Sequence, residues 1–157
     1  YEVMAAAESV TLENRMPPEG CFVIGDRNCL GVLFDNLVTN AIKYNKPGGK
    51  VTVSAEQTPD EVIVSVADTG IGIPEKYRQM LFGEFFRIQD VKKTPGTGLG
   101  LAIAKRVATE MGGSINVESQ VNVGSTFRVR LLAWKEPVSE ITQGRTNNGL
   151  KAQNTDR

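Results

Sequence analysis

The 157-residue sequence contains no histidine, only two cysteines and no long apolar run. Without histidine, the chain cannot supply a Ser-His-Asp triad, a Cys-His pair, a histidine-ligated zinc site or an imidazole general base. Any chemistry that it performs must therefore use carboxylates, amides, backbone N–H groups and cations.

The few cysteines, the balanced charge and the short apolar segments exclude further classes of protein. Cys21 and Cys29 lie outside any C-x-x-C pattern, so we expect two reduced side chains in a cytoplasmic domain. The 18 Lys+Arg are matched by 18 Asp+Glu, which leaves no basic excess for binding nucleic acid. No apolar segment approaches the roughly 18 residues of a membrane span, and no signal-peptide pattern opens the chain. We expect no membrane contact by this domain, while the parent protein can still carry an inner-membrane anchor elsewhere.

The chain divides into a folded unit and two flanking pieces. Residues 1–9 have the pattern of the end of an upstream linker helix, and residues 10–134 carry the apolar periodicity of one domain. Residues 135–157 have few apolar residues and no aromatic, so burial cannot offset their ordering entropy. We expect this last stretch to be a disordered tail or linker.

Hydrophobic periodicity predicts how the folded unit is built. We expect strands over residues 10–16 and 21–24, a hairpin over residues 51–66 and a second hairpin over residues 115–132. We expect helices over residues 27–45, 74–81 and 98–111. Hairpins beside helices of this length predict an α+β fold, a two-layer α/β sandwich with a mostly antiparallel sheet.

The predicted helix over residues 27–45 carries polar residues beside its apolar stripe. Asn36, Asn40 and Lys43 follow one another at steps of four and three, next to the stripe that runs from Leu30 to Ala41. A carboxamide can coordinate a hard cation, and a lysine can meet an anion. Taken alone, the helix favours the simpler interpretation, a solvated flank.

Asp68-Thr69-Gly70-Ile71-Gly72 directly follows an apolar strand. An acid at a strand end followed by two glycines places a carboxylate at the mouth of a cleft and allows close backbone approach. An ordinary turn before a helix explains the same residues. So does a homodimeric aspartic protease, since Asp-Thr-Gly presents the catalytic carboxylate in that class and this chain has one copy.

Two further segments suit a phosphate site. Gly96-Thr97-Gly98-Leu99-Gly100 leads into a predicted helix and offers backbone N–H groups to an anion. Its spacing matches neither the dinucleotide fingerprint G-x-G-x-x-G nor a Walker A loop. Upstream, the phenylalanine-rich segment Phe82–Arg87 precedes a cationic stretch, as a lid that closes over phosphates would require.

Taken in chain order, these four motifs together resemble the asparagine, first glycine, phenylalanine and second glycine boxes of sensor histidine kinases. The resemblance is to their catalytic and ATP-binding domain, and it extends from about Val10 to Leu132. It implies the Bergerat fold shared with gyrase B, Hsp90 and MutL, with a mixed, mostly antiparallel sheet covered on one face by about three helices.

The resemblance also implies a role for each matching residue. Asp68 would accept the adenine amino group, Tyr44 would pack against the base, and Asn40 would hold Mg²⁺. Asn36, Asn40, Lys43 and Arg87 would act in catalysis. The residues implied to contact ATP are Asn40, Lys43, Tyr44, Asp68, Gly70, Gly72, Ile73, Gly96, Thr97, Gly98, Leu99, Gly100, Leu101 and Thr126.

Asn36 departs from the pattern of the relatives that hydrolyse ATP. They carry a water-activating glutamate four residues before the Mg²⁺ asparagine, and an amide cannot act as a base. The resemblance thus implies phosphoryl transfer to a histidine on a separate dimerisation domain of the same protein. It also implies a response regulator as a further partner. It further implies a mobile lid over about residues 88–97 and a monomeric isolated domain. A serine kinase of the anti-sigma-factor type and a non-enzymatic nucleotide-binding module stay open as alternatives.

Overall fold

A computed structural model describes residues 1–88 and 96–135. The predicted tail lies outside the described residues except for Lys135, and residues 89–95 of the predicted lid lie outside them as well. Helix α1 occupies most of the stretch expected to end an upstream helix, while its continuation upstream stays a prediction.

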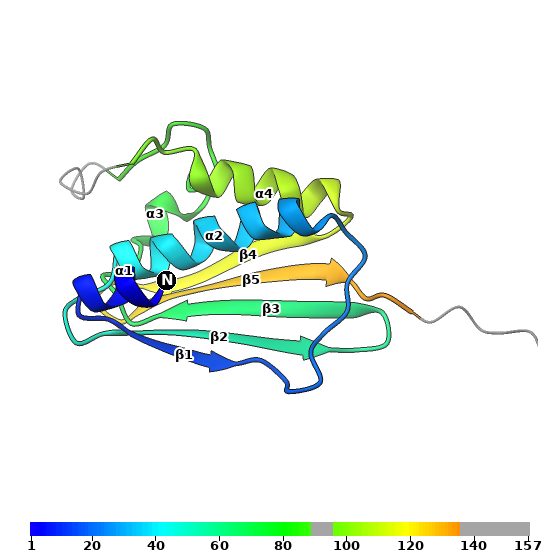
Figure 1. The fold of residues 1–157 in the computed structure, drawn as a ribbon. Helices are drawn as coiled ribbons and strands as arrows, with labels where there is room; N and C mark the ends of the chain where they lie inside the picture. The colour runs from blue at the N-terminus through cyan, green and yellow to red at the C-terminus, as the bar shows by residue number, and fades with distance from the viewer. Residues whose placement is uncertain (89–95, 136–157) are drawn as a thin grey trace, which may run out of the picture.

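The described residues form two layers, a helical layer lying on one face of a five-stranded sheet (Figure 1). This arrangement confirms the predicted α+β two-layer sandwich. In chain order the elements are α1 (Glu2–Ala7), β1 (Thr11–Arg15), α2 (Arg27–Lys43), β2 (Lys50–Gln57), β3 (Glu61–Asp68), α3 (Glu75–Arg78), α4 (Gly100–Glu110), β4 (Ser114–Gln120) and β5 (Gly124–Leu132).

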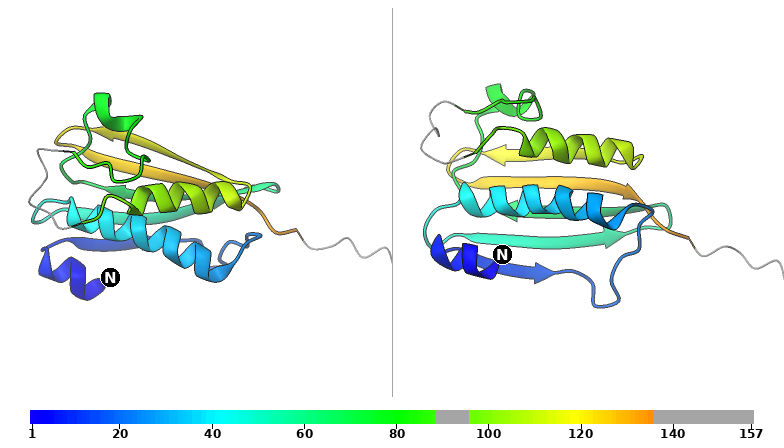
Figure 2. Two further views of the ribbon diagram at one scale, coloured as in Figure 1. Left: turned by 90° about the horizontal axis from the view of Figure 1, so that it is seen from above. Right: turned by 45° about the horizontal axis from the view of Figure 1, so that its top comes forward.

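The sheet has the strand order β1-β2-β3-β5-β4, which the tilted view in Figure 2 makes visible. Strands β1 and β2 run parallel, and α2 forms the crossover that a parallel pair requires. The other neighbouring pairs are antiparallel, so the sheet is mixed and mostly antiparallel, as predicted. The β2–β3 hairpin closes through Thr58, whose backbone N–H and side-chain oxygen both bond to Glu61.

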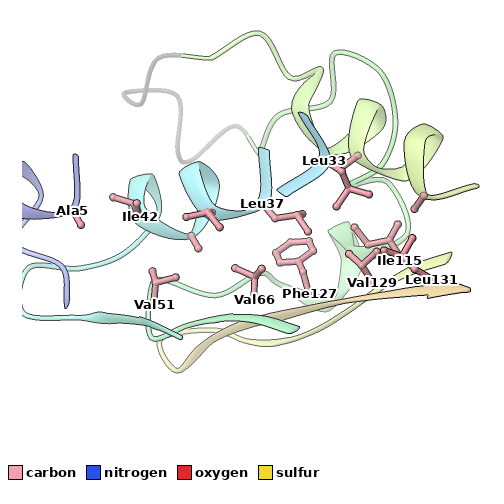
Figure 3. Close-up of a cluster of buried hydrophobic side chains, with 14 of the residues drawn as sticks. Ala5, Leu33, Leu37, Ile42, Val51, Val66, Ile115, Phe127, Val129 and Leu131 are labelled. Atoms are coloured by element: carbon pink, nitrogen blue, oxygen red, sulfur yellow. The ribbon is translucent and has the colours of Figure 1, made fainter. Parts of the chain in front are cut away.

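Helix α2 forms the centre of the helical layer. It begins after Asp26, whose Oδ1 accepts hydrogen bonds from the backbone N–H groups of Asn28 and Cys29, each at 2.9 Å. Its apolar face points down at the sheet, where fully buried Leu33 and Leu37 meet side chains of the central strands (Figure 3). Burial of this stripe places the polar residues beside it at the edge of the core.

Two predicted elements differ from the structure. The segment over residues 21–24 is no strand, and only Val23 bridges to Ala133, because the helix cap at Asp26 ends the extended run. The helix expected over residues 74–81 is limited to α3. Beyond it, i→i+3 bonds to the carbonyls of Tyr77 and Met80 tighten the chain into turns.

The face of the sheet away from the helices is polar. Arg128 pairs with Glu118 at 2.6 Å, and Arg130 pairs with Glu61 at 3.3 Å, in each case across neighbouring strands. Cross-strand ion pairs of this kind suit a solvated face. Within residues 1–88 and 96–135, no helix has the length and apolar character needed to cross a bilayer.

Candidate functional site

One pocket collects residues from all four sequence motifs. Its walls come from α2, from the end of β3 and the loop after it, from the segments on both sides of residues 89–95, and from the start of β5. The sequence-predicted residues that line it are Asn36, Asn40, Lys43, Tyr44, Asp68, Gly72, Ile73, Arg87, Gly96, Thr97, Gly98, Gly100 and Leu101.

Helix α2 contributes its polar edge to the pocket. Asn36 and Asn40 lie one turn apart on that edge, and Lys43 follows in the last turn. The Asn36 Nδ2 donates to the carbonyl oxygen of Val32 at 2.8 Å. A Cβ atom on Gly100 would lie only 2.5 Å from Asn36 Oδ1, so a larger residue there would displace the Asn36 amide. Both asparagines are half-buried and line the pocket, so the edge of the helix that carries them faces a concave site.

Asp68 ends β3 and presents a mostly buried carboxyl group at the pocket wall. Its Oδ1 accepts hydrogen bonds from the backbone N–H groups of Gly70 at 2.8 Å and Ser125 at 3.3 Å. Burial raises the pKa of Asp68, while the hydrogen bonds from Gly70 and Ser125 act in the opposite direction. The group can therefore accept a hydrogen bond from a ligand in a place with little water.

The loop after Asp68 is held from two sides by close backbone packing. Gly72 has a φ of +68°, and a Cβ there would lie 2.0 Å from the carbonyl oxygen of Gln120. A Cβ on Gly70 would lie 2.3 Å from the carbonyl oxygen of Tyr44. Gly70 thus supports the loop from behind and does not line the pocket. Both positions need glycine because a side chain there would collide with the neighbouring backbone, whether or not a ligand is bound.

Thr126 does not lie in the pocket, which corrects the prediction for this residue. Side chains alternate along β5, and buried Ser125 and Phe127 face the helices while Thr126 faces the opposite side. Ser125 therefore takes the position beside Asp68 that the sequence analysis gave to its neighbour. Leu99 also does not line the pocket and serves as the N-cap residue of α4.

The second glycine motif packs against the phenylalanine-rich segment. Gly98 has a φ of +76°, and a Cβ on it would come within 2.9 Å of the backbone of Phe85. Phe86 and Arg87 line the pocket, while the residue Phe85 is 70% exposed. The analysis of the sequence missed eight described lining residues, which are Thr39, Ala41, Ile71, Leu81, Phe86, Ile88, Ser125 and Phe127. Alternation along β5 was the signal that could have found the last two.

The lining combines two cationic side chains with one carboxyl group. It therefore suits a ligand that carries both an anionic group and a polar ring. The ionisable groups among its described residues are Lys43, Tyr44, Asp68 and Arg87. The described residues hold no cluster of three or more His, Cys, Asp or Glu that could bind a metal ion by itself. The Asn40 amide is an oxygen donor that fits Mg²⁺ only if a ligand supplies further oxygens.

A family model described as "Histidine kinase-, DNA gyrase B-, and HSP90-like ATPase" matches residues 25–135. Among curated proteins, the chain is 40% identical over 124 residues to the sensor-like histidine kinase SenX3 of Mycolicibacterium smegmatis. It is 34% identical over 137 residues to the sensor histidine kinase RppB of Synechocystis. These matches cover 78% and 86% of this chain but only 32% and 30% of the relatives, so the chain spans about a third of their length.

Solved structures give the same result. The mycobacterial sensor histidine kinase MprB superposes with a TM-score of 0.75 at 33% identity, over 84% of this chain and 90% of the other. The catalytic domain of histidine kinase ThkA gives a TM-score of 0.73 at 30% identity, over 84% and 86% of the two chains. The fold, the pocket and these matches together show that the chain belongs to the histidine kinase-, DNA gyrase B- and HSP90-like ATPase family and resembles the catalytic domains of its sensor histidine kinases.

Proposed function

We propose that residues 10–134 form the cytoplasmic ATP-binding catalytic unit of a sensor histidine kinase. The unit transfers the γ-phosphoryl group of Mg-ATP to a histidine on a separate dimerisation domain, from which a response regulator takes it. The observation that carries this proposal is that residues of all four motifs line one pocket. A related structure, ShkA in complex with AMPPNP, superposes at a TM-score of 0.73 and 28% identity and supports nucleotide binding here.

At the adenine end, the acceptor is the Asp68 carboxylate. A buried carboxylate held by two backbone N–H groups accepts the 6-amino hydrogen of adenine without reorganising. Tyr44 and Ile73 also line the pocket and would supply apolar surface for the ring. The base is therefore recognised by a hydrogen bond to one carboxylate and bound by apolar contact.

At the phosphate end, Lys43 and Arg87 supply positive charge, and the loop from Gly96 to Gly100 leads into the N-terminus of α4. Oriented N–H groups at a helix N-terminus favour a phosphate. Asn40 would hold Mg²⁺ through its side-chain oxygen, and the ion supplies charge neutralisation to the transferring phosphoryl group. Asn36 is an amide that bonds back to its own helix, so it provides no base for activating water.

Calorimetric titration with ATP in the presence of Mg²⁺ tests this proposal, with Asp68→Asn and Asn40→Ala compared with the unaltered chain. We expect Asp68→Asn to weaken binding at least tenfold, about 1.4 kcal/mol, because the new amide turns a donor toward the adenine amino group. We expect Asn40→Ala to retain adenine recognition and to abolish phosphotransfer to the dimerisation domain of the parent protein. Equal affinity of Asp68→Asn and the unaltered chain would refute the adenine assignment.

A further inference from the structure

Ser119 lies near the end of β4, does not line the pocket, and has a hydroxyl group that contacts three groups around it. Its Oγ accepts a hydrogen bond from the backbone N–H of Ile73 at 2.8 Å. The same Oγ lies 2.9 Å from the carbonyl oxygen of Gly124 and 3.0 Å from the Oγ of Ser125. One half-buried hydroxyl therefore connects the turn between β4 and β5 with the loop that follows Asp68.

Two partners of Ser119, Ile73 and Ser125, belong to the lining of the pocket. Ile73 belongs to the pocket wall that follows Gly72. Ser125 holds Asp68 through its backbone N–H, and its hydroxyl is a second hydrogen-bond partner of that carboxyl group. Ser119 itself is one step removed from any ligand, so it can act only through these two neighbours.

Counting hydrogens shows how Ser119 controls Ser125. A serine hydroxyl has one hydrogen to donate, and the carbonyl of Gly124 can only accept. If Ser119 donates to Gly124, the contact between the two hydroxyls requires Ser125 to donate to Ser119, and Asp68 loses that hydrogen. If Ser119 donates to Ser125 instead, the hydrogen of Ser125 is available to Asp68. The Ser125 hydroxyl is a partner of the Asp68 carboxylate, which can only accept, so the second arrangement is favoured: Ser125 donates to Asp68, and Ser119 gives its hydrogen to Ser125 in competition with Gly124.

The backbone of Ser119 is fixed from a third direction. Arg78 of α3 donates from Nη2 to the Ser119 carbonyl oxygen at 2.6 Å. The Arg78 Nε is buried without a hydrogen-bond partner among the described residues. The contact from Arg78 anchors the end of β4, and with it the Ser119 hydroxyl, because a charge-assisted hydrogen bond is stronger than a neutral one.

We propose that Ser119 is a positioning residue for adenine recognition, because it orients the Ser125 hydroxyl toward Asp68. The inference rests on the proposed function of Asp68 as the acceptor of the adenine amino group. The ligand class is an adenine nucleotide, and a purine nucleotide without the 6-amino group should be insensitive to Ser119.

The test compares affinities for ADP and inosine 5′-diphosphate, measured by calorimetry on the full 157-residue chain. We expect the unaltered chain to prefer ADP. Ser119→Ala should lower the affinity for ADP about tenfold, the effect of one hydrogen bond to a charged group, and should leave the affinity for inosine diphosphate within about twofold. Ser119→Cys keeps the size of the side chain and should show the same loss, while Ser119→Thr keeps the hydroxyl and should retain the preference.

Ser114→Ala, at the other end of the same strand, is the matched control and should leave both affinities unchanged. An unchanged preference in Ser119→Ala and Ser119→Cys would overturn the inference, and so would an equal loss of both affinities, which is the mark of a merely structural role. If Asp68→Asn loses the preference for ADP while Ser119→Ala and Ser119→Cys retain it, this inference alone is overturned. Equal binding of both nucleotides by the unaltered chain would overturn the proposed adenine site as well.

Discussion

At the scale of single residues, Asp68 holds a carboxyl group where the protein solvates it only in part. Two backbone N–H groups reach the same oxygen, Oδ1, and the surroundings are otherwise largely closed to water. Burial therefore works against ionisation, and the pKa is raised in spite of the hydrogen bonds. In the free protein this is a cost to stability that a bound adenine amino group would offset.

That cost predicts how Asp68→Asn changes stability with pH. The folded pKa is raised above its ordinary value of 3.8, so the neutral carboxyl favours folding at low pH, and this contribution is lost as the pH rises through the folded pKa. Asparagine does not titrate. We expect the free energy of unfolding of Asp68→Asn, relative to the unaltered chain, to increase from about pH 4 to about pH 7.

Urea unfolding at both pH values, without nucleotide, measures this difference. Asp60→Asn is a matched control, since Asp60 lies in an exposed turn where it meets Lys135. A constant or decreasing difference for Asp68→Asn across that range would contradict the role of burial.

Ser125 and Thr126 show what the sequence could predict at this scale and what it could not. The motif places a hydroxyl residue near Asp68, and the structure has one there. Alternation with Phe127 gives Ser125 the face toward the helices, whereas its place beside the carboxyl group depends on the register of β5 against β3, where Asp68 pairs with Ser125. Residue spacing alone does not set that register, because neighbouring positions on a strand differ only in the face that they occupy.

At the scale of elements, α4 meets α2 where Gly100 lies against the Asn36 side chain. We expect Gly100→Ala to destabilise the fold by about 1 kcal/mol, because the new methyl group displaces Asn36 Oδ1 and breaks its side-chain bond to Val32. In an Asn36→Ala background the same change should cost almost nothing. Denaturant unfolding of the four proteins in this double-mutant cycle gives the coupling directly.

Gly96→Ala serves as the control for that cycle, because a Cβ on Gly96 meets no atom of the described residues within 4 Å and its φ lies outside the left-handed region. Its free energy of unfolding should change by less than about 0.5 kcal/mol. Equal effects of Gly100→Ala in both backgrounds would mean that Asn36 is not the obstacle.

Gly31 offers an opposite prediction within α2. It lies on the exposed side of the helix, and a Cβ there meets no atom within 4 Å. We expect Gly31→Ala to stabilise the protein by about 0.5–1 kcal/mol, since alanine removes the entropic cost of glycine in a helix. Thermal and urea unfolding measure the gain, and nucleotide affinity should stay the same. A loss of stability would show that α2 needs glycine for a reason outside these contacts.

Elements with strong periodicity were predicted well, and those defined by tertiary contacts were not. The apolar stripe of α2 and the two hairpins follow from alternation and helical spacing alone. The segment over residues 21–24 has the same local pattern as a strand, but it lies where the chain turns into the cap of α2 and pairs only once. The parallel pairing of β1 with β2 is likewise set by the crossover through α2, which local patterns do not report.

At the scale of the whole molecule, the absence of histidine predicts a division of labour. The chain can position ATP, yet it has no imidazole to receive the phosphoryl group. We expect no acid-labile phosphoramidate on this chain after incubation with γ-labelled ATP and Mg²⁺. Labelling should appear on the proposed dimerisation domain of the parent protein when that domain is added, and a detectable phosphoramidate on the chain alone would contradict this division of labour.

The division of the molecule into a helical face and a polar sheet face has a practical consequence for experiments. The pocket is built from the helical side, while Arg128 and Arg130 project with their carboxylate partners from the other side. A fluorophore or a surface tether attached through a cysteine at either arginine would stand behind the sheet, away from the path of the nucleotide. The two existing thiols, Cys21 and Cys29, would first be replaced, so that the introduced cysteine on the polar face of the sheet is the one thiol available for labelling.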